Sequence, residues 1–175
     1  MAMLQARGVE QTRNGLEHRI RGINVPMHPS TIRLIAYWQE CEARGGLRMD
    51  RDIPAPGIAP LLQDLMVAEP VRDWADAHIR LAGSAVAEYF GRDLDGARMS
   101  DIFADEPRDG EMLLAGAKTA IARNRPGIME QILVDRGEIQ RQEMTALPMF
   151  APDGRAQWIL VGIFSFQPNG IPSHN

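Results

Sequence analysis

Residues 127–166 read GIMEQILVDRGEIQRQEMTALPMFAPDGRAQWILVGIFSF, and this stretch decides the fold class. It contains three segments rich in apolar and β-branched residues, at 127–135, 138–150 and 156–166. Arg136-Gly137 separates the first two segments and Pro152-Asp153-Gly154 the last two, and glycine, proline and aspartate favour tight turns. The pattern therefore predicts three consecutive strands joined by short turns.

The residues before this stretch predict two more strands and a set of helices. LMVAEPV (65–71) and AHIRLAG (77–83) are short apolar-rich segments on either side of a polar connection, which is typical of an antiparallel hairpin. Two short helical segments and a longer helix follow, at 84–90, 100–103 and 105–123. Small residues along the longer helix predict that it packs closely on the sheet.

One amphipathic helix is predicted nearer the N-terminus. Ser30 is a suitable residue to cap its start, and Gly45-Gly46 is suitable to end it. Between them Leu34, Trp38 and Cys41 recur on one helical face. This face predicts a helix that packs against the rest of the domain.

The chain divides into one domain with an extension at each end. Residues 1–29 are polar with little periodicity, so we expect an arm that is disordered or packs only in an assembly. The prolines of 52–56 interrupt the helical pattern before a short apolar helix at 58–65. We expect one folded domain at 30–167 and a short tail at 168–175.

Composition limits the class of protein. The 175 residues are 45% hydrophobic and 24% charged, which suits a single globular domain. A net charge of −4, with both signs scattered along the chain, argues against nucleic-acid binding. No apolar run is long enough to insert into a membrane. With one cysteine there is no disulfide framework, and we expect a cytoplasmic protein.

The order of these elements predicts the architecture. Two strands, short helices, a long helix and three strands make an α+β fold. We expect a five-stranded antiparallel sheet with the short helices and the longer helix on one face, preceded by an N-terminal helix.

Six short motifs follow one another along the chain. They are Ala36-Tyr37-Trp38, Arg44-Gly45-Gly46, Arg51-Asp52-Ile53, Leu61-Leu62, Ile79-Arg80-Leu81-Ala82-Gly83 and Gly91-Arg92-Asp93-Leu94-Asp95-Gly96. In this order and spacing the chain, over about residues 30–167, resembles the small stand-alone bacterial PAS family. The resemblance implies a PAS fold whose sheet and short helices enclose a core of small-molecule size. It also implies a sensory or protein-interaction role in signalling, but no particular ligand.

Apolar residues on the expected helices and strands are the candidates for a ligand pocket. They are Ile79, Leu81, Val86, Tyr89, Phe90, Leu94, Met99, Phe103, Ala117, Ile121, Met144 and Val161. The alternative is a filled core, because apolar residues at such spacing most often pack against one another. Tyr89 is of particular interest, since a buried hydroxyl needs a hydrogen-bond partner, which a ligand or a backbone carbonyl would supply.

The last strand is apolar on both of its faces, so both sides of the sheet must be covered. The candidates for a contact surface are Leu34, Trp38, Trp158, Leu160, Phe164 and Phe166. One hypothesis is a homodimer formed through this region. The intramolecular alternative, in which Leu34 and Trp38 pack on the last strand, stays open beside it.

The sequence names no cofactor. Flavin photosensors of the PAS class resemble one another in a reactive pocket cysteine, and the corresponding stretch 86–103 has none. We therefore expect no covalent flavin adduct, while noncovalent flavin stays open. Haem needs an axial ligand, and His18, His28 and His174 fall in the expected ends of the chain. His78 alternates with Ile79 and so faces away from the apolar side, which leaves haem a secondary hypothesis.

No catalytic or metal-binding constellation is evident. No cysteine or histidine pair has ligand spacing, and no nucleophile lies beside a base. Asp52, just before a proline-rich turn, is suited to a structural role as an acceptor of backbone amide hydrogen bonds.

Our leading hypothesis is a non-enzymatic sensory module. It would bind a small apolar or amphipathic ligand and signal through contact with a protein partner. The alternative is a constitutive adaptor with a filled core. A small-molecule enzyme, which needs acid–base groups with perturbed pKa values, is the third hypothesis.

Overall fold

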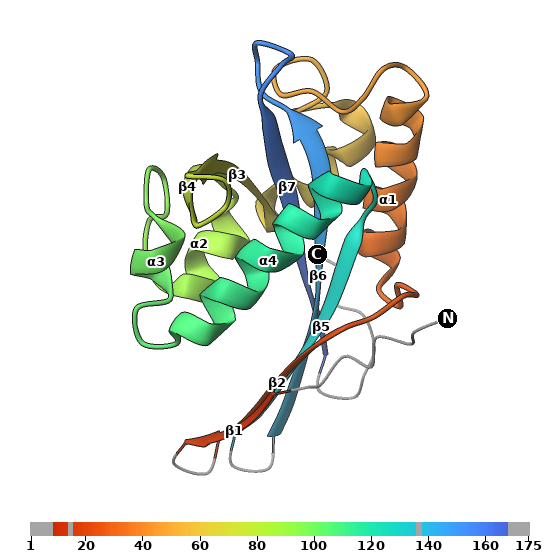
Figure 1. Ribbon diagram of the computed structural model, residues 1–175. Helices are drawn as coiled ribbons and strands as arrows, with labels where there is room; N and C mark the ends of the chain where they lie inside the picture. The colour runs from red at the N-terminus through yellow and green to blue at the C-terminus, as the bar shows by residue number, and fades with distance from the viewer. Residues whose placement is uncertain (1–8, 14–15, 136–137, 168–175) are drawn as a thin grey trace, which may run out of the picture.

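The computed structural model describes residues 9–13, 16–135 and 138–167. In these residues a single sheet of seven strands is formed, in the order β1-β2-β5-β6-β7-β3-β4, and every neighbouring pair is antiparallel (Figure 1). The strands are β1 Val9–Arg13, β2 Leu16–Gly22, β3 Leu65–Val71, β4 Asp76–Ala82, β5 Gly127–Asp135, β6 Glu138–Phe150 and β7 Gln157–Phe166. The α+β class predicted from the sequence is confirmed.

Helices cover both faces of the sheet. They are α1 Pro29–Glu42, the 3-10 helix η1 Pro56–Asp64, α2 Ser84–Phe90, α3 Met99–Ile102 and α4 Pro107–Arg123. The helices α2, α3 and α4 lie on one face, and α1 lies on the other with η1 (Figure 1). In the part of the chain that the structure describes, none of the helices has the length and apolar character needed to cross a membrane.

Two apolar clusters, one on each face of the sheet, form the core. Consecutive residues of β7 alternate between them: Ile159 and Ile163 belong to the cluster under α2–α4, and Leu160 and Phe164 to the cluster under α1. Side chains of a strand point to opposite faces in turn, so a strand buried on both sides must be apolar throughout. This explains why β7 is apolar from Trp158 to Phe164.

The candidate contact residues pack against other residues of the same chain. Leu34, Trp38, Leu160 and Phe164 are buried in the cluster under α1, against which Trp158 also packs. Phe166 is 7% exposed and meets the His28 ring edge-on, with the ring centroids 5.0 Å apart. Of the two arrangements left open by the sequence, the structure therefore has the intramolecular one, and these side chains offer little free surface. A homodimer stays a prediction.

The sheet is wider than the five strands expected, because residues 9–13 and 16–22 form a hairpin. Strand β2 pairs with β5, and in Figure 1 this hairpin extends with β5 away from the helices. The expectation of an unstructured arm is wrong for these residues. Sheet pairing through backbone hydrogen bonds leaves no apolar pattern in the sequence. Ile20 of β2 is a buried apolar residue, 4% exposed. Residues 1–8, 136–137 and 168–175, and with them the expected turn and tail, lie outside the described residues.

Helix α1 is capped by His28, not by Ser30. The Nδ1 atom of His28 accepts a hydrogen bond from the Ser30 amide at 3.1 Å. Glu143 of β6 accepts hydrogen bonds from the amides of Met27, at 2.8 Å, and His28, at 3.2 Å. A buried carboxylate therefore meets the amide-rich start of the helix, where negative charge is favoured.

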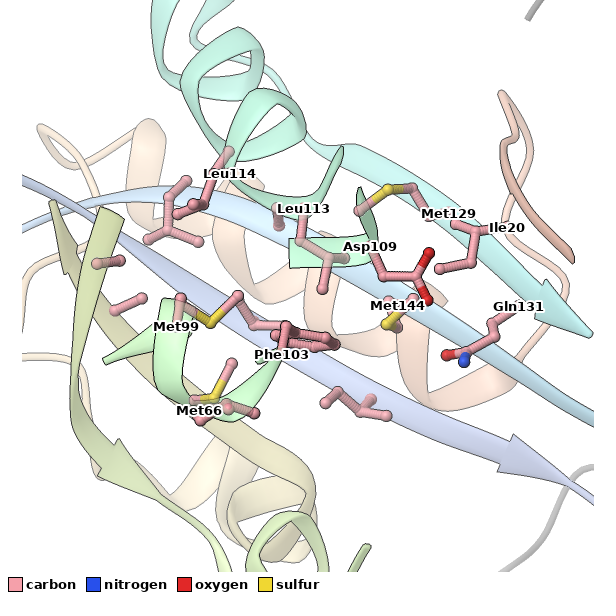
Figure 2. A pocket seen from close by; sticks show the side chains of 18 of the residues that line it. Ile20, Met66, Met99, Phe103, Asp109, Leu113, Leu114, Met129, Gln131 and Met144 are labelled. Atoms are coloured by element: carbon pink, nitrogen blue, oxygen red, sulfur yellow. The ribbon is translucent and has the colours of Figure 1, made fainter. Parts of the chain in front are cut away.

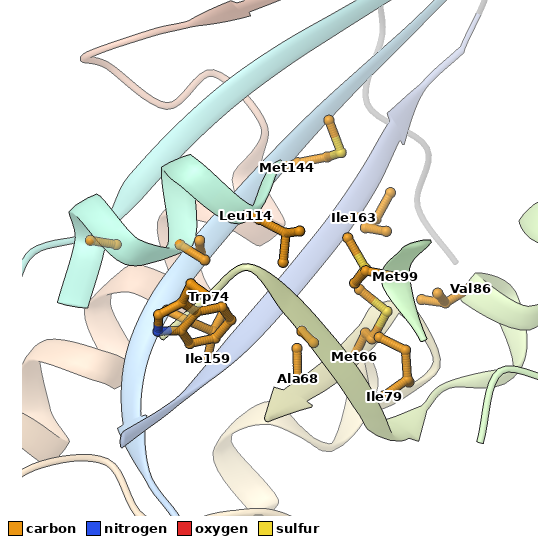
Figure 3. Packing of buried hydrophobic residues seen from close by; sticks show 14 of the residues in the cluster. Met66, Ala68, Trp74, Ile79, Val86, Met99, Leu114, Met144, Ile159 and Ile163 are labelled. Atoms are coloured by element: carbon orange, nitrogen blue, oxygen red, sulfur yellow. The ribbon is translucent and has the colours of Figure 1, made fainter. Parts of the chain in front are cut away.

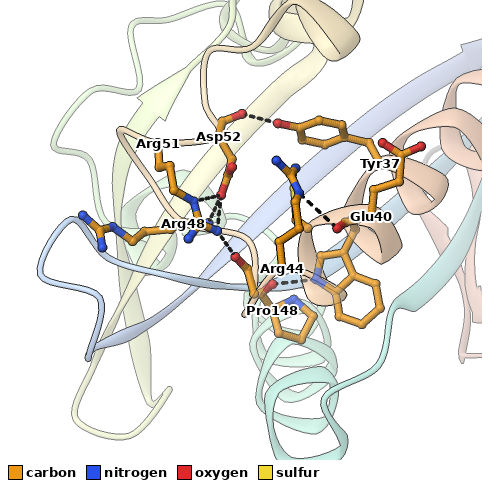
Figure 4. Close-up of polar contacts among 10 residues, drawn as sticks. Tyr37, Glu40, Arg44, Arg48, Arg51, Asp52 and Pro148 are labelled. Atoms are coloured by element: carbon orange, nitrogen blue, oxygen red, sulfur yellow. Dashed lines mark hydrogen bonds and ion pairs between the residues drawn. The ribbon is translucent and has the colours of Figure 1, made fainter.

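Asp52 fixes the connection between α1 and η1 (Figure 4). Its Oδ2 atom accepts hydrogen bonds from the Arg48 amide at 2.8 Å and from Arg51 Nε at 3.0 Å. The Tyr37 hydroxyl donates to the Asp52 carbonyl at 2.7 Å. Burial alone would raise the pKa of Asp52, but the hydrogen bonds from Arg51 and Arg48 outweigh it and the pKa is lowered. These contacts are those expected of a structural carboxylate.

Candidate functional site

A cavity of about 420 Å³ lies between the sheet and the helices α2, α3 and α4. Its walls come from β3, β5, β6 and β7 on one side and from the helices on the other, and most of the lining side chains are apolar (Figure 2). Ligand pockets in proteins typically span about 300–1,000 Å³ and are lined mostly by apolar groups. This cavity is the candidate functional site.

Seven of the twelve candidate pocket residues line the cavity. They are Tyr89, Phe90, Met99, Phe103, Ala117, Met144 and Val161. Of the others, Ile79 and Leu94 are fully buried in the adjoining core and Ile121 packs against it. Val86 lines a neighbouring cavity. Whether any of these residues contacts a ligand stays a prediction.

Leu81 does not belong to the cavity side of the sheet. Ile79 pairs with Ala68 and Leu81 with Val67, so that Arg80 is an extra residue opposite the β3 strand. Such a bulge shifts the alternation of side chains by one position. Leu81 therefore packs with the cluster under α1, whereas Ile79 stays under α2–α4. A strict alternation of faces, as used in the sequence analysis, cannot detect this shift.

Trp74 is a lining residue that the sequence analysis missed. It lies in the connection between β3 and β4, where Arg72, Asp73 and Trp74 have consecutive positive φ angles of 49°, 56° and 65°. This left-handed turn directs the indole back into the core, where Trp74 is 8% exposed (Figure 3). A tryptophan within an otherwise polar connection was the available signal.

Ile20 and Gln131 were missed for another reason. Ile20 comes from β2, inside the segment read as an arm, and Gln131 lies opposite Ile20 on β5. Gln131 is polar but 9% exposed, and it points into the same end of the cavity as Asp109 in Figure 2. Ile20 depends on the pairing of β2 with β5, which the sequence did not predict. Gln131 lies on a predicted strand and was left out because the candidates were apolar residues.

Polar groups gather at one end of the otherwise apolar cavity. Asp105, Glu106 and Asp109, at the start of α4, line it together with Tyr89 and Gln131. Asp105 and Glu106 are exposed, and Tyr89 is 42% exposed, so this end is the mouth of the cavity. The mouth therefore combines aromatic and acidic side chains.

Tyr89 is the polar group that two helices and the sheet position together. Partial burial is the main reason why the pKa of its hydroxyl is raised, the nearby carboxylates of Glu106 and Asp109 raise it further, and a side-chain hydrogen bond with Gln131 opposes the shift. The hydroxyl is therefore protonated at neutral pH. It is available to a ligand as a donor or an acceptor.

A second cavity of about 380 Å³ adjoins the first, and Tyr89 and Ile163 line both. Its lining is more polar and includes Arg33 and Gln142. Gln142 Nε2 donates to Ser165 Oγ at 3.0 Å, while its Oε1 atom is buried without a hydrogen-bond partner in the described chain. Tyr89 therefore stands between an apolar and a polar space.

The donors present restrict the cofactors that the cavity suits. Among the described residues of its lining there is no histidine, cysteine, serine, lysine or arginine, and the sulfur atoms come from methionines. Haem would depend on a methionine there. Cys41 is fully buried in the cluster on the other face of the sheet. Among the described residues, His, Cys, Asp and Glu form no group of three or more that could hold a metal ion.

Comparison with known proteins agrees with this architecture. A family model described as PAS domain matches residues 26–164, which is most of the chain. A search of curated proteins finds no match.

Proposed function

The chain belongs to the PAS-domain family, and on that premise we propose that it is a sensory module whose apolar cavity binds a small apolar or amphipathic molecule. Occupancy of the cavity would be passed on through contact with a protein partner. The observation that carries the proposal is the cavity of about 420 Å³ itself. We place the protein in the cytoplasm, as its composition suggests.

Packing energetics favour an occupied cavity. Protein interiors are close-packed, and the side chains around an unfilled space lose contacts that a bound molecule would restore. The space here is lined by Met66, Leu114, Ile159 and other apolar side chains. An apolar ligand would make favourable contacts with them. The same argument disfavours an adaptor with a filled core, since its core would have no such space.

The elements around the cavity give a route from ligand to surface. Tyr89 lines the cavity and is also 42% exposed. Its helix α2 has only seven residues and ends at Gly91 in a left-handed conformation. A ligand that favours one position of α2 over another would therefore change the exposed surface around Tyr89. A protein partner that binds this surface in only one of the two positions of α2 would therefore respond to the presence of the ligand.

We assign the chain no catalytic role. The one hydroxyl-bearing lining residue besides Tyr89 is Thr145, whose Oγ1 donates to the Gly127 carbonyl at 3.2 Å. The carboxylates of the mouth have no histidine beside them in the lining. A nucleophile activated by a base, as covalent catalysis requires, is therefore not assembled in the described cavity.

The test compares two alanines of α4. Ala117 lines the cavity, whereas Ala115 is exposed on the same helix. We expect a panel of small apolar and amphipathic molecules to contain compounds that raise the melting temperature of the wild type and of Ala115→Leu. Ala117→Leu, which fills part of the cavity, should lose this response. Compounds that stabilise all three proteins equally bind elsewhere, and a panel with no response would contradict the proposal.

A further inference from the structure

We propose that the cavity selects cationic amphiphiles, molecules with an apolar body and an ammonium group held at the mouth. This inference rests on the proposed ligand-binding function and narrows its ligand class. It follows from two properties of the mouth, its charge and its aromatic rings, which are independent of the apolar interior.

Among the described residues that line the cavity, the ionisable groups apart from the Tyr89 hydroxyl are all carboxylates. Asp105, Glu106 and Asp109 contribute to the mouth, and the described lining holds no arginine, lysine or histidine. Asp105 and Glu106 form no ion pair with a basic side chain in the described ranges of the chain. The charged side chains of the described lining are therefore negative, which favours a cation over an anion there.

Aromatic rings stand beside these carboxylates. The Tyr89 and Phe90 rings meet edge to face with their centroids 4.9 Å apart, and Phe90 and Phe103 do so at 5.8 Å. Rings at right angles present their electron-rich faces in more than one direction. Such groups of rings bind ammonium ions through cation–π attraction.

Backbone contacts join the two sets of groups. The Glu106 amide donates to the Phe103 carbonyl at 3.0 Å, and the Asp109 amide donates to the Glu106 carbonyl at 3.0 Å. A Cβ atom at Gly110 would lie 3.0 Å from the Phe103 Cβ, so α4 begins in close contact with this ring. Carboxylates and aromatic rings are thus held close together in the lining of one cavity.

The adjoining cavity shows that this composition is particular to one site. Its lining includes Arg33, His28 and one carboxylate, Asp64. That lining therefore holds both a basic and an acidic side chain. An anionic head group would be accommodated better there, whereas the mouth of the larger cavity favours a cation.

Three probes with the same apolar chain test the inference. Isothermal titration calorimetry would compare decyltrimethylammonium, decanol and decanoate, each below its micelle concentration, on the full chain. We expect decyltrimethylammonium to bind about tenfold tighter than decanoate, with decanol between them. Added salt should weaken only the ammonium probe, because it screens an exposed attraction.

A pair of double variants then tests the mouth itself. Asp105→Asn with Glu106→Gln should weaken ammonium binding about two- to fivefold and leave decanol unchanged. Asp95→Asn with Glu111→Gln removes the same charge from exposed positions that do not line the cavity. This control should retain the wild-type preference for the ammonium probe when both proteins are measured at the same ionic strength.

The outcomes separate this inference from the proposed function. If all three probes bind equally, or decanoate binds most tightly, and Ala117→Leu weakens them all, the cavity binds ligands but its preference for cations is wrong. If no probe binds to the wild type, the inference fails. If the melting-temperature panel also gives no response, the proposed function fails with it. Tight binding of the ammonium probe that Ala117→Leu does not weaken lies outside the cavity and overturns the inference.

Discussion

The two faces of the central sheet are built from the same strands but packed differently. Under α1, the buried cluster contains large side chains and no alanine; under α2–α4, five of the buried residues are alanines. These alanines are Ala68, Ala77, Ala117, Ala120 and Ala146. The cluster under α1 is packed from larger side chains and borders the second cavity only at Leu61 and Phe164, whereas the face under α2–α4 leaves room for the cavity of about 420 Å³.

The polar groups follow the same division. Under α1, Trp38 Nε1 donates to the Pro148 carbonyl at 2.8 Å, and the Asp52 carboxylate accepts from the Arg48 amide and the Arg51 side chain. Around the cavity, by contrast, Asp105 and Glu106 lie exposed at the mouth without an ion pair in the described chain. The Trp38 and Asp52 side chains are therefore satisfied inside the protein, whereas those of Asp105 and Glu106 face an opening.

The largest expected difference between the faces comes from neighbouring residues of β7. Leu160 is fully buried under α1, whereas Val161 is half-buried and lines the cavity. Leu160→Ala should cost about 2–5 kcal/mol of unfolding free energy, because it opens a hole in a filled core. Val161→Ala should cost about 1 kcal/mol or less, since it enlarges a space that already exists. If urea denaturation gives equal losses of unfolding free energy for the two variants, the two faces do not differ in packing as we describe.

The next largest expected effect is on the pH dependence of stability, and it comes from Asp52. Its pKa is lowered in the folded protein from the ordinary value of 3.8, so the stability it contributes is present above that value and is lost as the pH falls through the folded pKa. Asp52→Asn should cost about 1.5–3 kcal/mol at neutral pH, the range for hydrogen bonds to a charged group. Its stability should also fall less steeply below pH 4 than that of the wild type.

Urea midpoints measured from neutral to acid pH would check this expectation. Asp95→Asn, at an exposed loop position, serves as the control and should keep the wild-type slope. An Asp52→Asn variant with an unchanged acid slope would show that the carboxylate does not anchor the packed face.

Two glycines sharpen the comparison with effects of opposite sign. A Cβ atom at Gly162 would lie 2.8 Å from Leu34 and 2.7 Å from the Phe164 ring, so Gly162→Ala should overpack the face under α1 and cost about 1–3 kcal/mol. At Gly116 of α4 the nearest atom is the flexible end of Met129, at 3.4 Å. Gly116→Ala should stabilise the protein by about 0.5–1 kcal/mol, because alanine favours a helix. Thermal unfolding would show whether the two shifts differ in sign.

Local patterns in the sequence predicted most of the fold. The bounds of β3, α2, β5 and β6 match the expected segments, since turn-forming residues or polar connections mark where these elements begin or end. Membership of the PAS family, expected from short motifs, is confirmed. The hairpin of β1 and β2 was not predicted, because a polar strand held by backbone pairing resembles a loop in sequence.

The candidate site could be predicted only where it depends on local pattern. Residues on helices and regular strands, such as Phe103 and Met144, were placed at the cavity correctly. Leu81 was misplaced by the bulge at Arg80, and Trp74 and Ile20 reach the cavity through a left-handed turn and a distant strand pairing. Each of these features depends on tertiary structure, which one sequence does not show.

Native mass spectrometry of the protein as purified from cells, with an absorption spectrum of the same sample, is the most direct test that the cavity holds a ligand. We expect a noncovalent adduct on the 19.5 kDa chain that disappears on denaturation. The adduct should persist in Ala115→Leu and be lost in Ala117→Leu. A wild type without added mass, or an adduct retained equally by Ala117→Leu, would contradict the claim that the cavity between the sheet and α2–α4 is a ligand site.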